Sequence, residues 1–216
     1  MQRTAVVLFA RSPEREAAAK GMRFAAPLFR RVIAAWLESA ARAGAVPLVA
    51  CEVEDLAALD AIAPEVHREW LPQRGDSFGD RVANASFDAL ASFDAVVLAA
   101  IDAPPPATLA PVLEAVARGF TVVAPARDGG INFIGFTSLD RELLADLTLA
   151  HCRARIASLV VLDAITDVDS RVSLDDARRE RAWRAILAAI VVPIPYAPRV
   201  THAAMSRQLP SRAPPL

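Results

Sequence analysis

The sequence predicts an α/β protein in which helices cover both faces of a mostly parallel sheet. Short, continuously apolar segments rich in β-branched residues alternate with longer segments whose apolar residues recur every three or four positions. Because the strand-like segments lack polar alternation, both faces of the sheet should be buried, as in sheets built from strand–helix–strand units. Apolar residues make up 54% of the 216 residues, more than the roughly 45–50% of ordinary soluble domains, which favours a large core.

The N-terminal third of the chain contains three expected strands. Residues 4–10 are apolar and β-branched and form the first strand, whereas the charged segment 11–23 is expected to be a loop. Residues 27–43 carry apolar side chains at three- and four-residue steps, and Gly44 follows where a helix-ending glycine belongs, so they form a helix. The other elements, in chain order, are a buried strand at 47–52, a short helix at 55–62 that Pro64 ends, and a weaker strand at 66–71.

Residues 95–101 are the clearest strand because every one of them is apolar. A helix should precede this strand, opening within the glycine-containing segment 73–81 and running to about Ser92. The later elements are a helix at 108–118 closed by Gly119, a strand at 120–124, a tight turn at 127–130, a strand at 131–136, helices at 139–147 and 151–157, a strand at 159–162 and a final helix at 174–190. Residues 193–216 are proline-rich and are expected to be a tail, which leaves a single domain over residues 1–192.

Charge, cysteine content and apolar run length exclude several classes of function. The formal net charge is −1, so the chain is not a nucleic-acid binder that acts through bulk positive charge. Cys51 and Cys152 lie far apart, too few for a disulfide framework and without zinc-ligand spacing, so a reducing cytoplasmic location is expected. The longest apolar run near the end, residues 185–194, is shorter than the roughly 20 residues that span a bilayer, so no membrane span is expected.

Three polar segments follow the ends of predicted strands, at 11–23, 102–106 and 127–130. In open parallel sheets the ligand binds beyond the carboxyl ends of the strands, so we expect these segments to converge on one pocket. Asp102 follows an apolar strand and precedes three prolines, so its carboxylate should be firmly held. It either ligates a divalent ion that neutralises a diphosphate or caps the next helix.

The segment Asp128-Gly129-Gly130 has both a structural and a functional interpretation. Asp-Gly is the usual chemistry of a tight turn between two strands, which is sufficient to explain it. Asn132 follows on the next strand and could face the same cleft as Asp128. The sequence therefore leaves open whether Asp128 does more than turn the chain.

Two other segments carry weaker patterns. Gly75 and Asp76 precede a helix, so this segment either presents backbone N–H groups to an anion or only caps the helix. No Gly-Lys-Ser/Thr motif follows it, and no GxGxxG motif follows the first strand, which argues against a P-loop enzyme and an NAD or FAD enzyme. Asp167 and Asp169 would face one way in an extended segment and could share a cation, although the spacing alone favours a solvated acidic loop.

Five stretches in a fixed order carry a family resemblance: residues 6–13, 73–81, 97–104, 124–135 and 167–170. In this order they resemble the GT-A-like transferases, nearest the family called selenodomain-associated transferase 1. They are more distantly similar to the molybdenum-cofactor and phospholactate guanylyltransferases. The resemblance covers roughly residues 4–175, and its most specific parts are the Asp-Gly-Gly stretch and the order of the segments.

The resemblance implies a three-layer α/β/α fold with a mostly parallel, Rossmann-like sheet of the nucleotide-diphospho-sugar transferase type. It also implies a metal-dependent glycosyl or nucleotidyl transfer from a nucleotide-activated donor to a small-molecule acceptor, with Mg²⁺ or Mn²⁺ offsetting the leaving-group charge. The implied nucleotide-binding residues are Arg11, Lys20, Arg23, Gly75 and Asp76. The implied acceptor-binding residues are Gly129, Gly130 and Asn132, the metal ligands are Asp102 and Asp169, and the catalytic residues are Asp128 and Asp102.

The chain departs from the family pattern in its first loop. Relatives usually have proline-glycine followed by lysine-threonine-arginine-leucine, whereas here Pro13 is followed by glutamate, and only Lys20 and Arg23 stand in for the basic pair. Ile101 and Ile131 replace a serine and a tyrosine that are common in the family. The alternative interpretation is therefore a catalytically weakened or inactive relative that acts as a nucleotide-binding or interaction module, and a homo-oligomer is left open.

Overall fold

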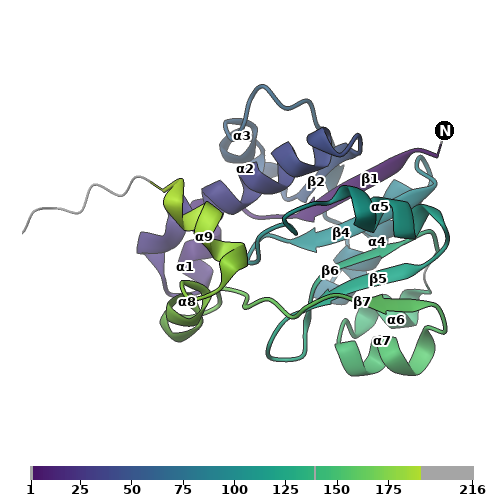
Figure 1. The fold of residues 1–216 in the computed structure, drawn as a ribbon. Helices are drawn as coiled ribbons and strands as arrows, with labels where there is room; N and C mark the ends of the chain where they lie inside the picture. The colour runs from purple at the N-terminus through teal and green to yellow at the C-terminus, as the bar shows by residue number, and fades with distance from the viewer. Residues whose placement is uncertain (1, 139, 191–216) are drawn as a thin grey trace, which may run out of the picture.

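The computed structural model describes residues 2–138 and 140–190, which are organised around one seven-stranded sheet (Figure 1). The strand order across the sheet is β3-β2-β1-β4-β6-β5-β7. In chain order the strands are β1 (Thr4–Phe9), β2 (Val46–Cys51), β3 (Glu69–Pro72), β4 (Ala95–Ala100), β5 (Thr121–Pro125), β6 (Ile131–Phe136) and β7 (Leu159–Val161). The proline-rich segment predicted at 193–216 lies outside the described residues.

The sheet is parallel except for β6, which runs antiparallel to both of its neighbours, β4 and β5. The central pairs are in plain register, with Val6 opposite Val97 on β4 and opposite Pro47 on β2. The turn at residues 127–130 is too short for the crossover of a dozen or more residues that parallel strands need, so β5 and β6 pair as a hairpin. The predicted mostly parallel sheet is therefore confirmed.

Helices cover both faces of the sheet and complete three layers. The helical elements are α1 (Pro13–Ala19), η1 (Arg23–Ala25), α2 (Ala26–Arg42), η2 (Val53–Asp55), α3 (Leu56–Asp60), α4 (Phe78–Leu90), α5 (Ala110–Ala117), α6 (Arg141–Ala145), α7 (Leu149–Arg155), α8 (Arg171–Ala177) and α9 (Arg181–Ala188). One core lies between the sheet and α2, α5, α8 and α9, and the other lies between the sheet and α4, α6 and α7. Alternate residues of β1 serve the two cores, because successive strand side chains point to opposite faces.

The charged segment expected to be a loop after β1 is instead largely helical. Pro13 occupies the first turn of α1, where its missing N–H is tolerated, and the segment that follows consists mainly of alanine, glutamate and arginine. Glu14 and Glu16 lie in the first turn, where negative charge is favourable beside the helix dipole. The expectation of a loop was wrong because it weighed charge above helix propensity.

The single helix expected over residues 174–190 is divided into α8 and α9 at residues 178–180. At this break the Glu180 carboxylate accepts hydrogen bonds from the backbone N–H of Thr166 at 3.1 Å and from its hydroxyl at 2.6 Å. The indole of Trp183, which is fully buried, donates to the Thr166 carbonyl at 2.7 Å. These contacts to one distant residue are not visible in the helical pattern, so periodicity alone could not locate the break.

Both cysteines are free and buried. Burial raises the pKa of the Cys51 thiol to about 11, with further contributions from Asp55 and Glu52, and burial also raises the pKa of Cys152. High thiol pKa values disfavour the reactive thiolate, so these cysteines serve the core. Within residues 2–138 and 140–190, no helix has both the length and the apolar content that crossing a bilayer requires.

Candidate functional site

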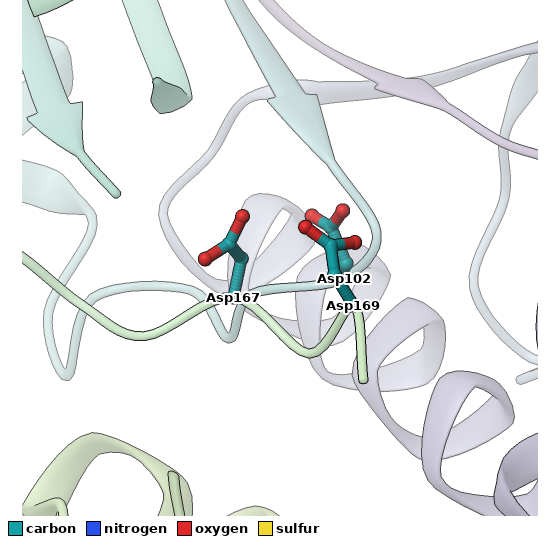
Figure 2. Close-up of side chains that lie close together, drawn as sticks. All are labelled: Asp102, Asp167 and Asp169. Atoms are coloured by element: carbon teal, nitrogen blue, oxygen red, sulfur yellow. The ribbon is translucent and has the colours of Figure 1, made fainter. Parts of the chain in front are cut away.

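The candidate site lies beyond the carboxyl ends of β1 and β4, where α1 and the segment before α8 meet (Figures 1 and 2). Asp102 follows β4, and Asp167 and Asp169 lie on the loop before α8. The backbone N–H of Val168 donates to the carbonyl of Asp102 at 2.9 Å, and the Val168 side chain is fully buried. This backbone hydrogen bond and the buried valine fix the loop against the end of β4.

The three aspartates form an acidic cluster. Each offers a carboxylate oxygen that lies within 4.8 Å of those of the other two. Figure 2 shows Asp102 and Asp169 close together, with Asp167 to one side. The burial of Val168 between the two loop aspartates is consistent with both of them lying toward Asp102, while Asp169 stays exposed to solvent.

Lys20 lies among these carboxylates. Its Nζ donates to Asp102 Oδ2 at 3.0 Å and to Asp169 Oδ1. It also pairs with Glu16 Oε1 at 3.4 Å, one helical turn earlier. The side chain of Lys20 is only 11% exposed, so the ammonium is held in place and is not freely solvated.

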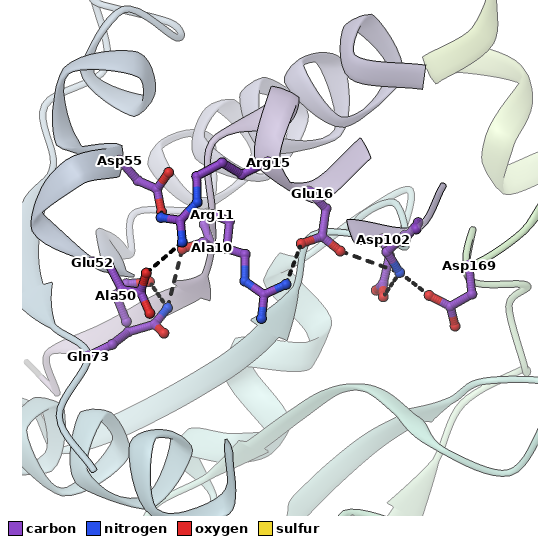
Figure 3. Close-up of polar contacts among 11 residues, drawn as sticks. Ala10, Arg11, Arg15, Glu16, Ala50, Glu52, Asp55, Gln73, Asp102 and Asp169 are labelled. Atoms are coloured by element: carbon purple, nitrogen blue, oxygen red, sulfur yellow. Dashed lines mark hydrogen bonds and ion pairs between the residues drawn. The ribbon is translucent and has the colours of Figure 1, made fainter. Parts of the chain in front are cut away.

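Glu16 links this ammonium to a second cation. Its other oxygen, Oε2, lies 3.9 Å from a guanidinium nitrogen of Arg11. The resulting row of charges runs from Arg11 through Glu16 to Lys20 and on to Asp102 and Asp169. Figure 3 labels four of its members, Arg11, Glu16, Asp102 and Asp169. Positive and negative groups alternate from Arg11 to Lys20, and Lys20 then pairs with both aspartates, so each charge is partly neutralised by a neighbour.

The surroundings of Asp167 disfavour its negative charge. Burial raises the pKa of Asp167 above its ordinary value, and the nearby carboxylates of Asp102 and Asp128 raise it further, whereas Lys20 lowers it. The folded protein therefore carries the Asp167 charge at a free-energy cost at neutral pH. A carboxylate with this surplus of negative neighbours favours a cation beside it.

Asp167→Asn is expected to raise the midpoint of urea unfolding at pH 7. Because the folded-state pKa of Asp167 lies above its unfolded value, the unfolded chain loses this proton first, and wild-type stability falls as pH rises through that interval. The advantage of the variant should therefore shrink as pH falls toward the ordinary aspartate pKa of about 3.9. Urea unfolding of both proteins between pH 4 and 7 checks this, and a lower midpoint for the variant at pH 7 would contradict it.

A cavity of about 270 Å³ adjoins the row of charges. Arg11, Glu16 and Asp102 line its charged end, and apolar side chains from β1, β4 and β6 line much of the rest. Phe78, at the first position of α4, is 61% exposed and meets Phe9 edge to face with ring centroids 5.4 Å apart. The cavity therefore combines a charged end with an apolar and aromatic end, as a pocket for a small polar molecule with a ring would.

The residues expected to bind a nucleotide are brought to this site only in part. Arg11 lines the cavity, and Lys20 pairs with Glu16 and Asp102, which line its charged end, whereas Arg23 is exposed in η1 and lines none of the described cavities. Gly75 has φ 140°, and a Cβ there would lie 2.6 Å from the Asp80 Cβ, so this glycine is required for the close approach of the chain to α4. Asp76 is exposed, and Ser77 is the residue that caps α4 by accepting from the N–H of Asp80 at 3.1 Å.

The Asp128-Gly129-Gly130 segment forms the predicted tight turn. Asp128 Oδ1 accepts from the N–H of Gly130 at 2.9 Å, and Gly129 has φ 100°, which favours glycine. The side-chain amide of Asn132 donates to the Ile165 carbonyl at 2.8 Å and also lines the cavity. Asn132 thus ties β6 to the segment that precedes Asp167, and Asp128 is near enough to raise the pKa of Asp167.

Three residues near the site were absent from the sites predicted by sequence. Asp167 was considered together with Asp169 as a cation-binding pair but was not assigned to a site, and Glu16 was assigned no role. Gln73 lines the cavity and donates from Nε2 to the Ala50 carbonyl at 2.9 Å. The helical spacing of Glu16 and Lys20, four residues apart, is the one pattern from which their pairing could have been predicted.

The acidic cluster has the chemistry of a divalent cation site. Mg²⁺ and Mn²⁺ prefer oxygen ligands, and all three members of the cluster supply carboxylate oxygens. The raised pKa of Asp167 and the contacts of the Lys20 ammonium with Asp102 and Asp169 both indicate that positive charge is favourable at this position. The residues present therefore fit a hard divalent cation.

Comparison with solved structures shows the same fold in several proteins. A candidate nucleotide-diphospho-sugar transferase from Desulfovibrio desulfuricans is 24% identical, with a TM-score of 0.65 over 87% of this chain and 95% of that chain. The 4-diphosphocytidyl-2C-methyl-D-erythritol synthase from Anaerococcus prevotii is 9% identical, with a TM-score of 0.52 over 82% and 96% of the two chains. A Mycobacterium tuberculosis protein solved in complex with manganese is 20% identical, with a TM-score of 0.51 over 82% and 97%.

At these identities the likeness is one of fold, and it confirms the predicted α/β architecture of the nucleotide-diphospho-sugar transferase type. No curated protein matches the chain. A family model described as an uncharacterized protein conserved in bacteria matches residues 36–151, just over half of the chain. The more specific resemblance to selenodomain-associated transferase 1 stays a prediction. By its sequence, the chain belongs to this bacterial family, DUF2064.

Proposed function

We propose that the protein is a metal-dependent transferase that uses a nucleotide-activated donor, for glycosyl or nucleotidyl transfer. The observation that carries this proposal is that Asp102 belongs both to the acidic cluster, where it pairs with Lys20, and to the charged end of a cavity beyond the carboxyl ends of β1 and β4. Carboxylates for a metal and basic groups for phosphates are the two requirements of a diphosphate donor site. The fold, shared with nucleotidyl and sugar transferases, is consistent with this chemistry.

In this proposal Asp102 and Asp169 hold the metal, with Asp167 as a further carboxylate. The metal, when bound, offsets negative charge on the donor phosphates and on the leaving group. Arg11 and Lys20 bind phosphate oxygens with charge-assisted hydrogen bonds, and Arg23, Gly75 and Asp76 are proposed to contact the nucleotide more peripherally. The apolar end of the cavity, with Phe9 and Phe78, takes the ring system of the donor.

The turn after β5 is proposed to form the acceptor side. Asp128 uses Oδ1 for the turn, and we assign its other oxygen to orienting an acceptor hydroxyl or removing its proton. Gly129 and Gly130 permit the acceptor to approach the backbone closely, and Asn132 fixes the adjoining segment through its hydrogen bond to Ile165. The proton of the acceptor would thus pass to a carboxylate that lies close to the acidic cluster.

The expected result is that a nucleotide donor stabilises the protein only when a divalent metal is present. At a ligand concentration about 100-fold above Kd, binding adds roughly 2.7 kcal/mol, which corresponds to a rise in Tm of about 5–10 °C for a chain of this size. The measurement is a thermal shift with UDP-, GDP- and CDP-linked sugars and with CTP and GTP, each with and without Mg²⁺ or Mn²⁺. If no nucleotide gives metal-dependent stabilisation, the proposal fails.

A second candidate function is a nucleotide-binding or interaction module without catalysis. The observation that favours it is Glu16, which places a negative charge between the two cations assigned to phosphates, Arg11 and Lys20. A phosphate must displace this carboxylate, which weakens binding. Metal-dependent binding without release of nucleoside mono- or diphosphate or pyrophosphate, when the protein is incubated with small hydroxylated acceptors, would support the module over the enzyme.

A further inference from the structure

The acidic cluster already contains a cation that belongs to the chain. The ammonium of Lys20 bonds directly to Asp102 and Asp169, two of the three carboxylates that would hold a metal. Lys20 is the only lysine in the sequence, against 23 arginines among the 24 basic residues. An ammonium is a compact point charge, which resembles a metal ion more closely than a planar guanidinium does.

The helix that carries Lys20 is fastened to the sheet independently of the acidic cluster. Arg15, on the same helix, pairs with Glu52 at 2.9 Å and with the fully buried Asp55 at 2.7 Å (Figure 3). It also pairs with Glu54 at 3.2 Å. These three carboxylates follow β2 and hold α1 from the side opposite Lys20. Lys20 therefore extends from an anchored helix end, and its side chain can change partners without movement of the helix.

We infer that Lys20 is an internal counter-ion that competes with the divalent metal for Asp102 and Asp169. This inference rests on the proposed function and adds a regulation of the same site. In the metal-free protein the ammonium neutralises the two carboxylates. A divalent ion displaces it, and the released ammonium turns toward the donor phosphates, where Arg11 and Glu16 already lie in the same row of charges.

Competition of this kind couples the two ligands. The metal alone must displace Lys20 from its partners, whereas the metal together with a phosphate gives the displaced ammonium a new anion. Each ligand therefore binds more tightly in the presence of the other, as linkage requires. Free metal ions at low concentration would then occupy the site little until a donor is present.

Removal of the ammonium is the direct test. Lys20→Met keeps much of the length and apolar character of the side chain and removes the competing charge. We expect this variant to bind Mn²⁺ alone, without nucleotide, at least about tenfold more tightly than the wild-type protein. Isothermal titration calorimetry or the electron paramagnetic resonance signal of free Mn²⁺ measures the affinity. Arg171→Met is the matched control, because it removes a positive charge two residues from Asp169 that has no ion pair with the cluster in the described part of the chain.

A second readout uses the wild-type protein and does not depend on the folding of a variant. Because Lys20 is the only lysine, protein labelled with ¹³C at the lysine ε-carbon has a single lysine signal in the NMR spectrum. That signal should move as Mg²⁺ is added and saturate at the concentration at which the metal binds. A signal unmoved by saturating Mg²⁺ would show that the ammonium is not displaced.

The outcomes separate this inference from the proposed function. If wild type and Lys20→Met bind Mn²⁺ with equal affinity, the inference is overturned while the metal site stands. If Arg171→Met tightens Mn²⁺ binding as much as Lys20→Met does, the effect is one of general charge and the inference is overturned as well. If neither the wild type nor Lys20→Met binds Mn²⁺, with or without a nucleotide, the proposed metal site fails and the inference fails with it.

Discussion

Asp102→Asn is expected to reduce metal-dependent nucleotide affinity by about 100-fold or more while the protein stays folded. Replacement of residues that only orient metal ligands commonly costs 10–100-fold, so loss of a directly coordinating charge should reach at least the upper end of that range. The side chain of Asp102 is 21% exposed, and asparagine has nearly the same shape, so packing around it is preserved. Titration of the nucleotide that stabilises the wild-type protein, with and without Mg²⁺, measures the loss.

The controls for this variant follow from its surroundings. Asp60→Asn removes an exposed carboxylate of α3, outside the acidic cluster, and should bind nucleotide and metal as the wild type does. Asp102→Asn also removes a partner of Lys20, so its unfolding midpoint must be compared with that of the wild type in the absence of metal. If Asp102→Asn retains wild-type affinity in the presence of metal, the role assigned to this carboxylate is wrong.

Trp36→Ala is expected to lower the free energy of unfolding by about 3–5 kcal/mol, the range for truncation of large buried aromatic side chains. Trp36 lies on α2, is fully buried, and packs edge to face against Phe133 with ring centroids 5.7 Å apart. Its indole N–H also donates to the carbonyl of Ala103 at 2.9 Å. Truncation leaves a cavity and deprives a buried carbonyl of its donor, and both effects destabilise the fold.

The same residue links the core to the candidate site, because Ala103 follows Asp102 directly. Trp36→Phe keeps an aromatic ring but removes the donor, so it should cost less stability than Trp36→Ala and still loosen the segment that carries Asp102. Urea unfolding gives the stability, and metal-dependent nucleotide binding reports the position of Asp102. Trp70→Ala, on the half-buried edge strand β3, is the comparison and should lower the free energy of unfolding less than Trp36→Ala does. An equal loss of unfolding free energy in the two variants would contradict the role assigned to Trp36 in the core.

The strands and the helix ends were predictable from the sequence because their causes are local. Residues 95–101 are apolar without interruption, and β4 occupies all but the last of these positions. Gly44 and Gly119 were expected to end helices, and they have φ values of 77° and 89°, which favour glycine after a helix. These patterns need no knowledge of the rest of the fold.

The composition of the site was less predictable because its causes are distant in the sequence. The convergence of Lys20, Asp102 and Asp169 follows from the rule that ligands gather beyond the carboxyl ends of strands. The rule does not state which cation pairs with which carboxylate, and so the ion pairs of Lys20 with Asp102 and Asp169 were not anticipated. Asp167 acquires its raised pKa from burial and from neighbours that only the folded chain supplies.

The acidic cluster and its partner Lys20 come partly from outside the segment that the family model matches. The family model spans residues 36–151, which include Asp102 but not Lys20, Asp167 or Asp169. A comparison of relatives confined to that segment would therefore include Asp102 but miss the other two aspartates and Lys20. Homologues can instead be sorted by the residues at the positions of Lys20 and Asp169. Those with both residues would have a metal-binding carboxylate and a lysine that competes with the metal, and the others would lack this competition.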